Sequence, residues 1–189
     1  MKQIEFCTGN SSKIKEANEF IQSRNKKIIV QSNKIDFIEI QSISQKEILL
    51  DKMKQAISKT NGSFIIDETG IYFDGYNNFP GTLTKYVIKS LGIGGIKKII
   101  AGTNGTAYFK TTILYSEDKK TYKFFEGILK GKIVIDDTKV DNNDFPFSSI
   151  FIPDGCNDYL ININNDINFI DHRKQALDKL INYIKENEK

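Results

Sequence analysis

The chain has 189 residues, of which 39% are hydrophobic and 11% aromatic, a composition sufficient for one packed core and unlike that of a disordered protein. Lysine and arginine total 27 against 24 acidic residues, and this net charge of +3 is spread along the chain, which argues against a nucleic-acid-binding module. No segment approaches the roughly 20 apolar residues of a membrane helix, and the first residues lack the apolar core of a signal peptide, so we expect a soluble, cytoplasmic protein without a membrane partner.

The first third of the chain alternates between predicted strands and helices. Residues 4–7 form an apolar run typical of a strand, and residues 11–24 have the spacing of an amphipathic helix with Ser11 as its cap. Residues 28–31 predict a second short strand, and residues 34–41 are expected to be extended. A helix follows, with Lys52 at the border of an apolar stripe that contains Leu49, Met53 and Ala56.

The middle of the chain is predicted to hold two short β-like runs and two short helices. After a turn at Asn61-Gly62, the sequence SFIIDETGIYFDG predicts two runs that Thr69-Gly70 separates. A turn at Pro80-Gly81 is expected to precede helices over residues 85–91 and 93–101.

Two long strands are predicted next. Residues 107–115 and 122–135 have the pattern of antiparallel strands around a turn at 116–120, with Gly127 and Gly131 permitting bulges.

A closing helix is predicted from about residue 172. Its buried face would comprise Ala176, Leu177, Leu180, Ile181 and Ile184. Because no linker or internal repeat interrupts the chain, we expect one domain over residues 1–189. Cys7 and Cys156 lack metal-ligand spacing and are expected to be reduced thiols.

The triplet Thr8-Gly9-Asn10 stands between the first predicted strand and the first helix. A strand that turns through glycine into a helix presents unpaired backbone N–H groups, where an anion such as phosphate is favoured. Lys13 lies in the first helical turn, where a cation opposes the helix dipole unless an anion is bound there. This arrangement predicts a phosphate site; the alternative is an exposed lysine on a polar helix face.

Asp67 and Glu68 follow the apolar run 64–66, where an unpaired charge would be costly to bury. Neighbouring residues of a regular strand face opposite sides, but a break at Thr69-Gly70 would let both carboxylates point into one cleft. One carboxylate would then help to bind a hard cation, and the other would accept a proton from an attacking water. The alternative is a pair of solvated acids at a strand end.

The segment Asp171-His172-Arg173 contains the only histidine of the chain. One interpretation makes Asp171 a helix N-cap and leaves His172 and Arg173 at the surface. The other places His172 and Arg173 beside a bound nucleotide. Phe145 and Phe147 suit stacking on a base, although aromatic residues at this spacing more often fill a core.

Taken in order, a series of segments resembles the inosine/xanthosine triphosphate pyrophosphatase family. They are TGN with Lys13, then Glu39, Lys52, DETG, FPG, FEG, PDG and DHR, and the match spans Thr8 to Leu177. The resemblance implies an α/β fold with two lobes, a long mixed β-sheet flanked by helices and a central cleft. It also implies a homodimer and Mg²⁺-dependent cleavage of nucleoside triphosphates to monophosphate and pyrophosphate.

The resemblance further implies roles for individual residues. Glu68 matches the catalytic acidic position, which is usually Asp, and would orient or deprotonate the water that attacks the α-phosphorus. The catalytic residues would be Glu68, Lys52 and Lys13. The metal ligands would be Glu39, Asp67 and Glu68. The substrate-binding residues would be Thr8, Gly9, Asn10, Lys13, Thr69, Phe145, Ser148, His172 and Arg173.

The base-reading loop departs from the family pattern. The family commonly has FGYDPIF or FGWDPCF where this chain has FPFSSIF, so Pro146 replaces a glycine and Ser148 replaces the aspartate associated with base recognition. Ile167 stands where a lysine is expected. His172 and Arg173 match the family's SHR motif near the base, with Asp171 in place of its serine. Losing a hydrogen-bond partner at a buried recognition site costs ~1 to 3 kcal/mol, enough to change base discrimination about tenfold.

Two hypotheses of different classes follow. The first is a pyrophosphatase acting on ITP, dITP and XTP with altered base specificity and no nucleic-acid partner. The second is a nucleotide-binding or dimerisation protein whose catalysis has decayed, which the altered loop favours. Retention of five charged residues favours the enzyme: Lys13, Glu39, Lys52, Asp67 and Glu68.

Overall fold

The structure, a computed structural model, describes residues 1–136, 146–164, 166 and 168–187. The chain divides into two compact units. Unit 1 comprises Met1–Thr69, Thr111–Gly127 and His172–Lys189, and unit 2 comprises Gly70–Lys110 and Ile128–Asp171.

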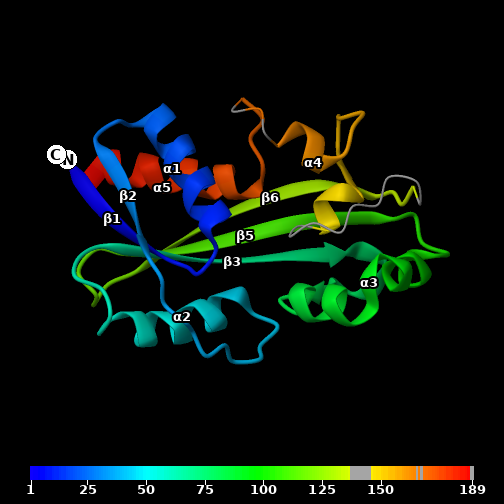
Figure 1. Ribbon diagram of the computed structural model, residues 1–189, viewed down its shortest axis with the longest axis horizontal. Helices are drawn as coiled ribbons and strands as arrows, with labels where there is room; N and C mark the ends of the chain where they lie inside the picture. Colours follow the sequence, from blue (N-terminus) through cyan, green and yellow to red (C-terminus); the bar gives the residue numbers. More distant parts are fainter. Residues whose placement is uncertain (137–145, 165, 167, 188–189) are drawn as a thin grey trace. The chain divides into compact units, whose positions relative to one another are not determined.

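One mixed sheet contains the seven strands of the described residues. The strands are β1 (Lys2–Cys7), β2 (Ile28–Asn33), β3 (Phe64–Phe73), β4 (Phe79–Gly81), β5 (Thr106–Ser116), β6 (Lys123–Ile133) and β7 (Phe151–Pro153). Their order is β2-β1-β3-β5-β6-β7, and β4 pairs with β3. Figure 1 labels β1, β2, β3, β5 and β6. β1 is parallel to β2 and β3, whereas β4 is antiparallel to β3 and β7 is antiparallel to β6.

Helices accompany this sheet in both units. They are α1 (Ser11–Arg24), α2 (Gln45–Ala56), α3 (Thr84–Ile100), α4 (Leu160–Ile163) and α5 (His172–Asn187), with short 3₁₀ turns η1 (Asp74–Tyr76) and η2 (Pro146–Ser149). The expected α/β fold with a mixed sheet and flanking helices is confirmed. The single-domain boundary over residues 1–189 and the central cleft stay predictions.

The pleat of β3 sorts the side chains of unit 1 onto two faces. Phe64 and Ile66 pack in one core with the apolar stripe of α2, as predicted for that helix. On the other side of the strand lie α1 and α5, which contact each other (Figure 1). Alternation along β3 therefore directs Glu68 toward α2 and directs Asp67 and Thr69 toward α1 and α5.

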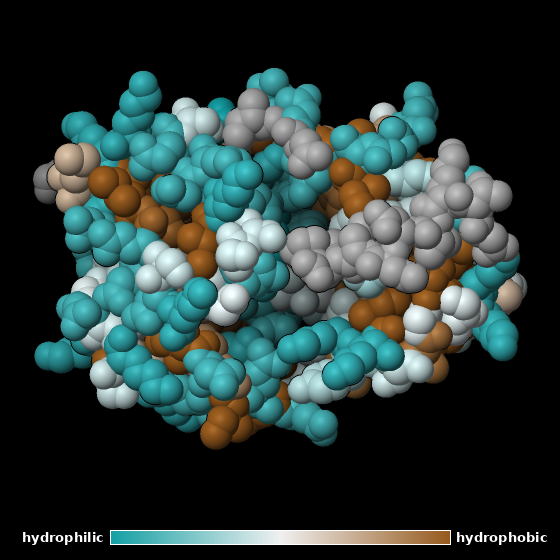
Figure 2. Space-filling model, in the orientation of Figure 1, coloured by the Kyte–Doolittle hydropathy of each residue, from teal (hydrophilic) through white to brown (hydrophobic). Residues whose placement is uncertain are grey.

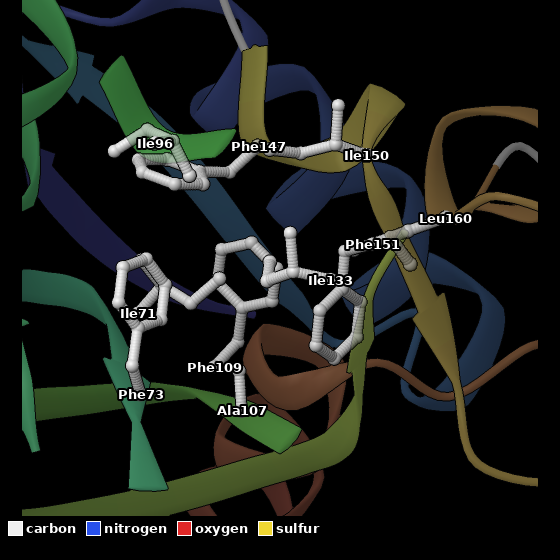
Figure 3. Close-up of a cluster of buried hydrophobic side chains, with 10 residues drawn as sticks. All are labelled: Ile71, Phe73, Ile96, Ala107, Phe109, Ile133, Phe147, Ile150, Phe151 and Leu160. Carbon is white, nitrogen blue, oxygen red and sulfur yellow. The ribbon is translucent and has the colours of Figure 1, made fainter. Parts of the chain in front are cut away.

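Unit 2 has a core of its own, drawn in Figure 3. Its buried members are Ile71, Phe73, Ile96, Ala107, Phe109, Ile133, Phe147, Ile150, Phe151 and Leu160. Phe147 packs edge-on against Phe73, with ring centroids 6.1 Å apart, so this aromatic residue of the FPFSSIF loop fills the core.

Most predicted elements are confirmed, including the closing helix, whose five predicted apolar residues are all buried. The predicted helices 85–91 and 93–101 are confirmed as the two parts of α3, which meet at a kink where Gly92 has non-helical backbone angles, with φ at 61°.

Three local predictions are wrong. Asn10 caps α1 in place of Ser11, because its side chain accepts hydrogen bonds from the first-turn amides. β3 continues through Thr69-Gly70, so the DETG segment lies within one strand. Pro80-Gly81 lies in β4, because its backbone pairs with Ile71 and Tyr72 of β3.

Hydrophilic side chains cover most of the face shown in Figure 2. Among the described residues, no helix is both long enough and apolar enough to cross a bilayer. Cys7 and Cys156 are both free thiols, as predicted, and burial raises the pKa of Cys7 to about 12.

Gly127 allows the first turn of α5 to lie directly on β6. A Cβ atom at this position would lie 1.9 Å from the carbonyl oxygen of His172 and 2.9 Å from the amide nitrogen of Ala176. Because both are backbone atoms at the start of α5, they cannot move aside as a flexible side chain would. The glycine thus fixes where His172 and Arg173 enter unit 1.

We expect Gly127→Ala to lower the free energy of unfolding by about 2 kcal/mol or more, since overpacking here must displace backbone. Gly62→Ala is a suitable control, because a Cβ there meets no atom within 4 Å. Urea unfolding of both variants would measure the difference. Equal stability of the two variants would show that α5 can shift on β6 at little cost.

Candidate active site

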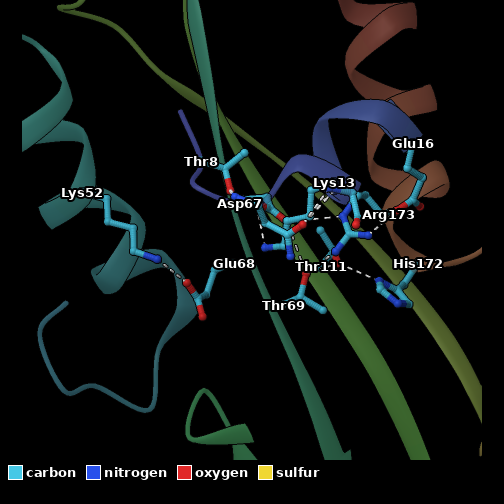
Figure 4. A network of polar contacts seen from close by, with 12 residues as sticks. Thr8, Lys13, Glu16, Lys52, Asp67, Glu68, Thr69, Thr111, His172 and Arg173 are labelled. Atoms are coloured by element: carbon cyan, nitrogen blue, oxygen red, sulfur yellow. Dashed lines mark hydrogen bonds and ion pairs between the residues drawn. The ribbon is translucent and has the colours of Figure 1, made fainter. Parts of the chain in front are cut away.

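Asp67 and Glu68 lie at neighbouring positions of β3 and therefore point to its opposite faces (Figure 4). The expectation that a break at Thr69-Gly70 lets both carboxylates share one cleft is thus wrong, because the strand is regular there. The pairing of β1 with β3 includes Phe6 and Ile65, and both acids lie beyond it, at the level of the Thr8-Gly9-Asn10 loop. Each acid belongs to a separate cluster of polar side chains.

The Thr8-Gly9-Asn10 loop is arranged by its own side chains. Asn10 Oδ1 accepts from the amides of Ser12 at 2.9 Å and Lys13 at 3.2 Å, and Thr8 Oγ1 accepts from the amide of Asn10 at 3.2 Å. These amides are therefore engaged, in contrast to the expectation of unpaired donors. Gly9 is exposed, and a Cβ there would meet no protein atom within 4 Å, so protein packing does not require the glycine.

The first cluster surrounds the buried carboxylate of Asp67. Lys13 Nζ lies 2.9 Å from its Oδ1, and Arg173 Nε lies 3.4 Å from its Oδ2. Arg173 also pairs with Glu16, with 2.6 Å between Nη1 and Oε2. Burial by itself would raise the pKa of Asp67, but the charges of Lys13 and Arg173 outweigh it and lower the pKa to about 2. Asp67 is therefore a fixed negative charge between two cations.

The same cluster continues through two hydroxyl groups to His172. Thr69 Oγ1 and Thr111 Oγ1 are 2.7 Å apart, and Thr111 Oγ1 lies 2.6 Å from His172 Nδ1. His172 is only 6% exposed. Its burial, together with the charge of Arg173, lowers the pKa of the imidazole to about 3. His172 is thus neutral near pH 7, and the interpretation that leaves His172 and Arg173 at the surface is wrong.

The second cluster joins Lys52 of α2 to two glutamates. Lys52 Nζ lies 2.7 Å from Glu68 Oε2 and 2.7 Å from Glu39 Oε1. Burial would lower the pKa of Lys52, but the two carboxylates outweigh it and raise the pKa. Burial raises the pKa of Glu68, against the opposing effect of Lys52. Glu68 is therefore the more basic of the two neighbouring acids.

Glu39 and Glu68 are the carboxylates that best fit a divalent cation. Because both contact the same ammonium group, the contacting oxygens lie within about 5.4 Å of each other. The described residues contain no cluster of three metal-ligating side chains, but Mg²⁺ is commonly held by one or two carboxylates together with substrate phosphates. Asp67 is engaged by Lys13 and Arg173, and its expected role as a metal ligand stays a prediction.

Most of the expected site residues belong to unit 1: Thr8, Gly9, Asn10, Lys13, Glu39, Lys52, Asp67, Glu68, Thr69, His172 and Arg173. Ser148 lies in unit 2, on η2, and is partly buried. Phe145 and Ile167 lie outside the described residues.

Two members of the first cluster were not identified from the sequence. Glu16 lies one turn after Lys13, and this i, i+3 spacing was a signal for a shared helix face. Thr111 lies within an ordinary strand pattern, and nothing in that pattern distinguishes it from Thr112.

Sequence comparison with known proteins assigns the chain to a family. The model of the Ham1 family matches residues 4–183. The chain belongs to the Ham1 family. It is 30% identical to the dITP/XTP pyrophosphatase of Thermococcus kodakarensis, with 98% of each chain covered, and 35% identical to the inosine triphosphate pyrophosphatase of Candida glabrata, with 80% of each covered. The resemblance inferred from the sequence is therefore confirmed.

Solved structures of the family share the fold. A HAM1 protein from Coxiella burnetii superposes with a TM-score of 0.80 at 21% identity, covering 98% of this chain and 100% of that one. The Staphylococcus aureus Ham1 protein has a TM-score of 0.75 at 23% identity, with 100% of both chains covered.

The low pKa of His172 predicts a pH-dependent stability. A histidine whose pKa is about 3 when folded and about 6.5 when unfolded binds its proton mainly in the unfolded state between these values. Stability is then fully present above pH 6.5 and falls as the pH is lowered. We expect the free energy of unfolding to be about 2 kcal/mol lower at pH 5 than at pH 7.

Urea unfolding between pH 5 and 7 would measure this slope. Because His172 is the only histidine, His172→Gln should flatten it, whatever the absolute stability of that variant. A slope that persists unchanged in His172→Gln would contradict the assignment.

Proposed function

We propose that this chain hydrolyses nucleoside triphosphates to monophosphate and pyrophosphate, with the deaminated purine nucleotides ITP, dITP and XTP as substrates. The supporting observation is that two lysines from different helices, Lys13 and Lys52, each contact one acid of the Asp67-Glu68 pair in a Ham1-family chain. The names of its relatives, dITP/XTP pyrophosphatase and inosine triphosphate pyrophosphatase, supply the substrate class.

The two acids are suited to different tasks. A general base works best when its pKa is close to the operating pH, and burial raises the pKa of Glu68. Asp67, with a pKa of about 2 and two cationic partners, is a poor base but a firm anchor for Lys13 and Arg173. We therefore assign the orientation and deprotonation of the attacking water to Glu68, as the resemblance implies.

The lysines would balance the charge of the triphosphate. Phosphoryl transfer depends chiefly on positioning and charge neutralisation, which cations at two points along the polyphosphate provide. Lys13 projects from the first turn of α1, beside the Thr8-Gly9-Asn10 loop, and Lys52 is held by Glu39 and Glu68. Phosphate oxygens would compete with the carboxylates for both ammonium groups. Glu68 would then be released from Lys52 and could accept a proton from the attacking water.

Mg²⁺ is the cofactor that this proposal requires, with Glu39 and Glu68 as the side chains that fit it. When bound, the ion would neutralise charge on the phosphate oxygens. Two further points rest on the resemblance alone: the homodimer and an altered base preference due to Ser148 and Ile167. The cytoplasmic location stays an expectation from the sequence.

A product assay over a nucleotide panel tests the proposal. We expect ITP, dITP or XTP to release pyrophosphate in the presence of Mg²⁺, and the chelator EDTA to abolish the release. Standard and modified nucleoside triphosphates in the same panel would measure the base preference. Tight nucleotide binding without hydrolysis of any of them would favour the decayed binding protein, and release of orthophosphate would contradict the proposed cleavage position.

Glu68→Gln tests the catalytic assignment. The amide keeps the size of the side chain but cannot act as a base, so we expect turnover to fall roughly 100-fold or more while nucleotide binding is largely retained. Glu19→Gln on α1 is a matched control, because its carboxylate is 60% exposed and lies outside both clusters. Unchanged turnover in Glu68→Gln would remove Glu68 from the mechanism.

A further inference from the structure

A continuous line of hydrogen bonds connects His172 to Asp67 through two threonine hydroxyl groups (Figure 4). The distances are 2.6 Å from His172 Nδ1 to Thr111 Oγ1, 2.7 Å on to Thr69 Oγ1, and 3.5 Å from there to Asp67 Oδ2. Thr69 Oγ1 also accepts from Arg173 Nη2 at 3.4 Å. Thr111 is completely buried at the centre of this line.

The number of available protons limits which group donates and which accepts in each hydrogen bond of this line. Each hydroxyl group donates one hydrogen bond and accepts up to two, whereas an ionised carboxylate only accepts. If Thr69 donates to Asp67, it must accept from Thr111, and Thr111 must then accept from a proton on His172 Nδ1. In the reverse direction Thr69 donates to Thr111, and its single proton is no longer available for Asp67.

The direction toward Asp67 satisfies all four contacts at once. Thr69 then accepts from Thr111 and from Arg173 and donates to the carboxylate, which uses its full capacity. A charged acceptor at the end of a line also strengthens the hydrogen bonds directed toward it. The Asp67 carboxylate, paired with Lys13 and Arg173, can only accept. Every hydrogen bond of the line is therefore donated in the direction of Asp67, and this common direction is the polarity of the line.

We infer that neutral His172 carries its proton on Nδ1, and that Thr111 is a positioning residue that transmits this polarity to Thr69 and so orients the Asp67 carboxylate. Asp67 in turn holds Lys13 and Arg173. The effect of Thr111 on turnover rests on the proposed function, whereas the proton position on His172 does not.

Removing the Thr111 hydroxyl is expected to remove only the hydrogen bonds that it makes with Thr69 and His172. Asp67 would keep its ion pairs with Lys13 and Arg173, so the charged cluster would persist. Thr69 would lose the partner that directs its proton toward Asp67, and His172 Nδ1 would lose the acceptor that selects one tautomer.

Nitrogen NMR of the ¹⁵N-labelled full chain tests the first part directly. Because the protein has one histidine, its two ring nitrogens give the only imidazole signals, and a protonated ring nitrogen differs widely in shift from an unprotonated one. At pH 7 we expect Nδ1 to be protonated and Nε2 to be unprotonated. A proton on Nε2 would overturn the inference.

Three variants test the role of Thr111. Thr111→Val removes the hydroxyl and should mix the tautomers and lower kcat roughly tenfold with little change in KM, whereas Thr111→Ser should restore both the spectrum and kcat. Thr112→Val is the matched control, since Thr112 is also 0% exposed and its hydroxyl donates one 2.7 Å hydrogen bond to Gln45 on the other face of β5. The control should leave the imidazole signals unchanged.

The outcomes separate this inference from the proposed function. An Nδ1–H tautomer that depends on the Thr111 hydroxyl supports the line even if no nucleotide is hydrolysed, a result that would contradict only the proposed function. If Thr111→Val keeps the wild-type tautomer, or loses no more kcat than Thr112→Val, the positioning role is wrong. If Thr111→Val does not fold, the wild-type spectrum and Thr111→Ser decide the question.

Discussion

The buried carboxylate of Asp67 is the constraint on which the rest of the site depends. An ionised carboxylate with almost no exposure is very costly unless cations and hydrogen-bond donors surround it. Here they come from α1, through Lys13, and from α5, through Arg173, two helices at opposite ends of the sequence. Both cations reach the carboxylate only when both helices are in place on β3, so this half of the site depends on the packing of α1 and α5.

The pleat of β3 gives this site two halves. Asp67 and Thr69 face the helices α1 and α5, and Glu68 faces α2 with Lys52. Each lysine neutralises the acid on its own face, which leaves the acids with different surroundings and hence with pKa values shifted in opposite directions. Neighbouring carboxylates on a single strand can therefore carry different roles, one as an anchor and one as a base, without any irregularity in the backbone.

The sequence predicted the elements and the charged residues better than it predicted their grouping. Spacing alone placed α1, α2 and α5, because apolar periodicity reports burial directly. The family resemblance supplied Lys13, Lys52, Asp67 and Glu68 as a set. It did not predict which lysine pairs with which acid. The prediction assumed a break at Thr69-Gly70, whereas in a regular strand the two acids point to opposite faces. The role of Thr111 could not be predicted from the sequence. It depends on contacts with Thr69 and His172, which are 42 and 61 positions away along the chain.

Under the proposed function, the residues expected to handle phosphate and the residue expected to read the base belong to different units. The lysines and acids that handle phosphate in the proposed reaction all belong to unit 1, whereas Ser148, at the altered base-reading position, belongs to unit 2. Replacing an aspartate by Ser148 removes no charge from the clusters around Asp67 and Glu68, so their ion pairs do not depend on it. His172 is the exception, because the resemblance places it near the base while the structure ties it to Asp67 through Thr111 and Thr69. Under the proposed function, a substitution at His172 would therefore disturb both phosphate handling and base recognition, whereas a substitution at Ser148 would change the choice of base without removing an ion pair of Asp67 or Glu68.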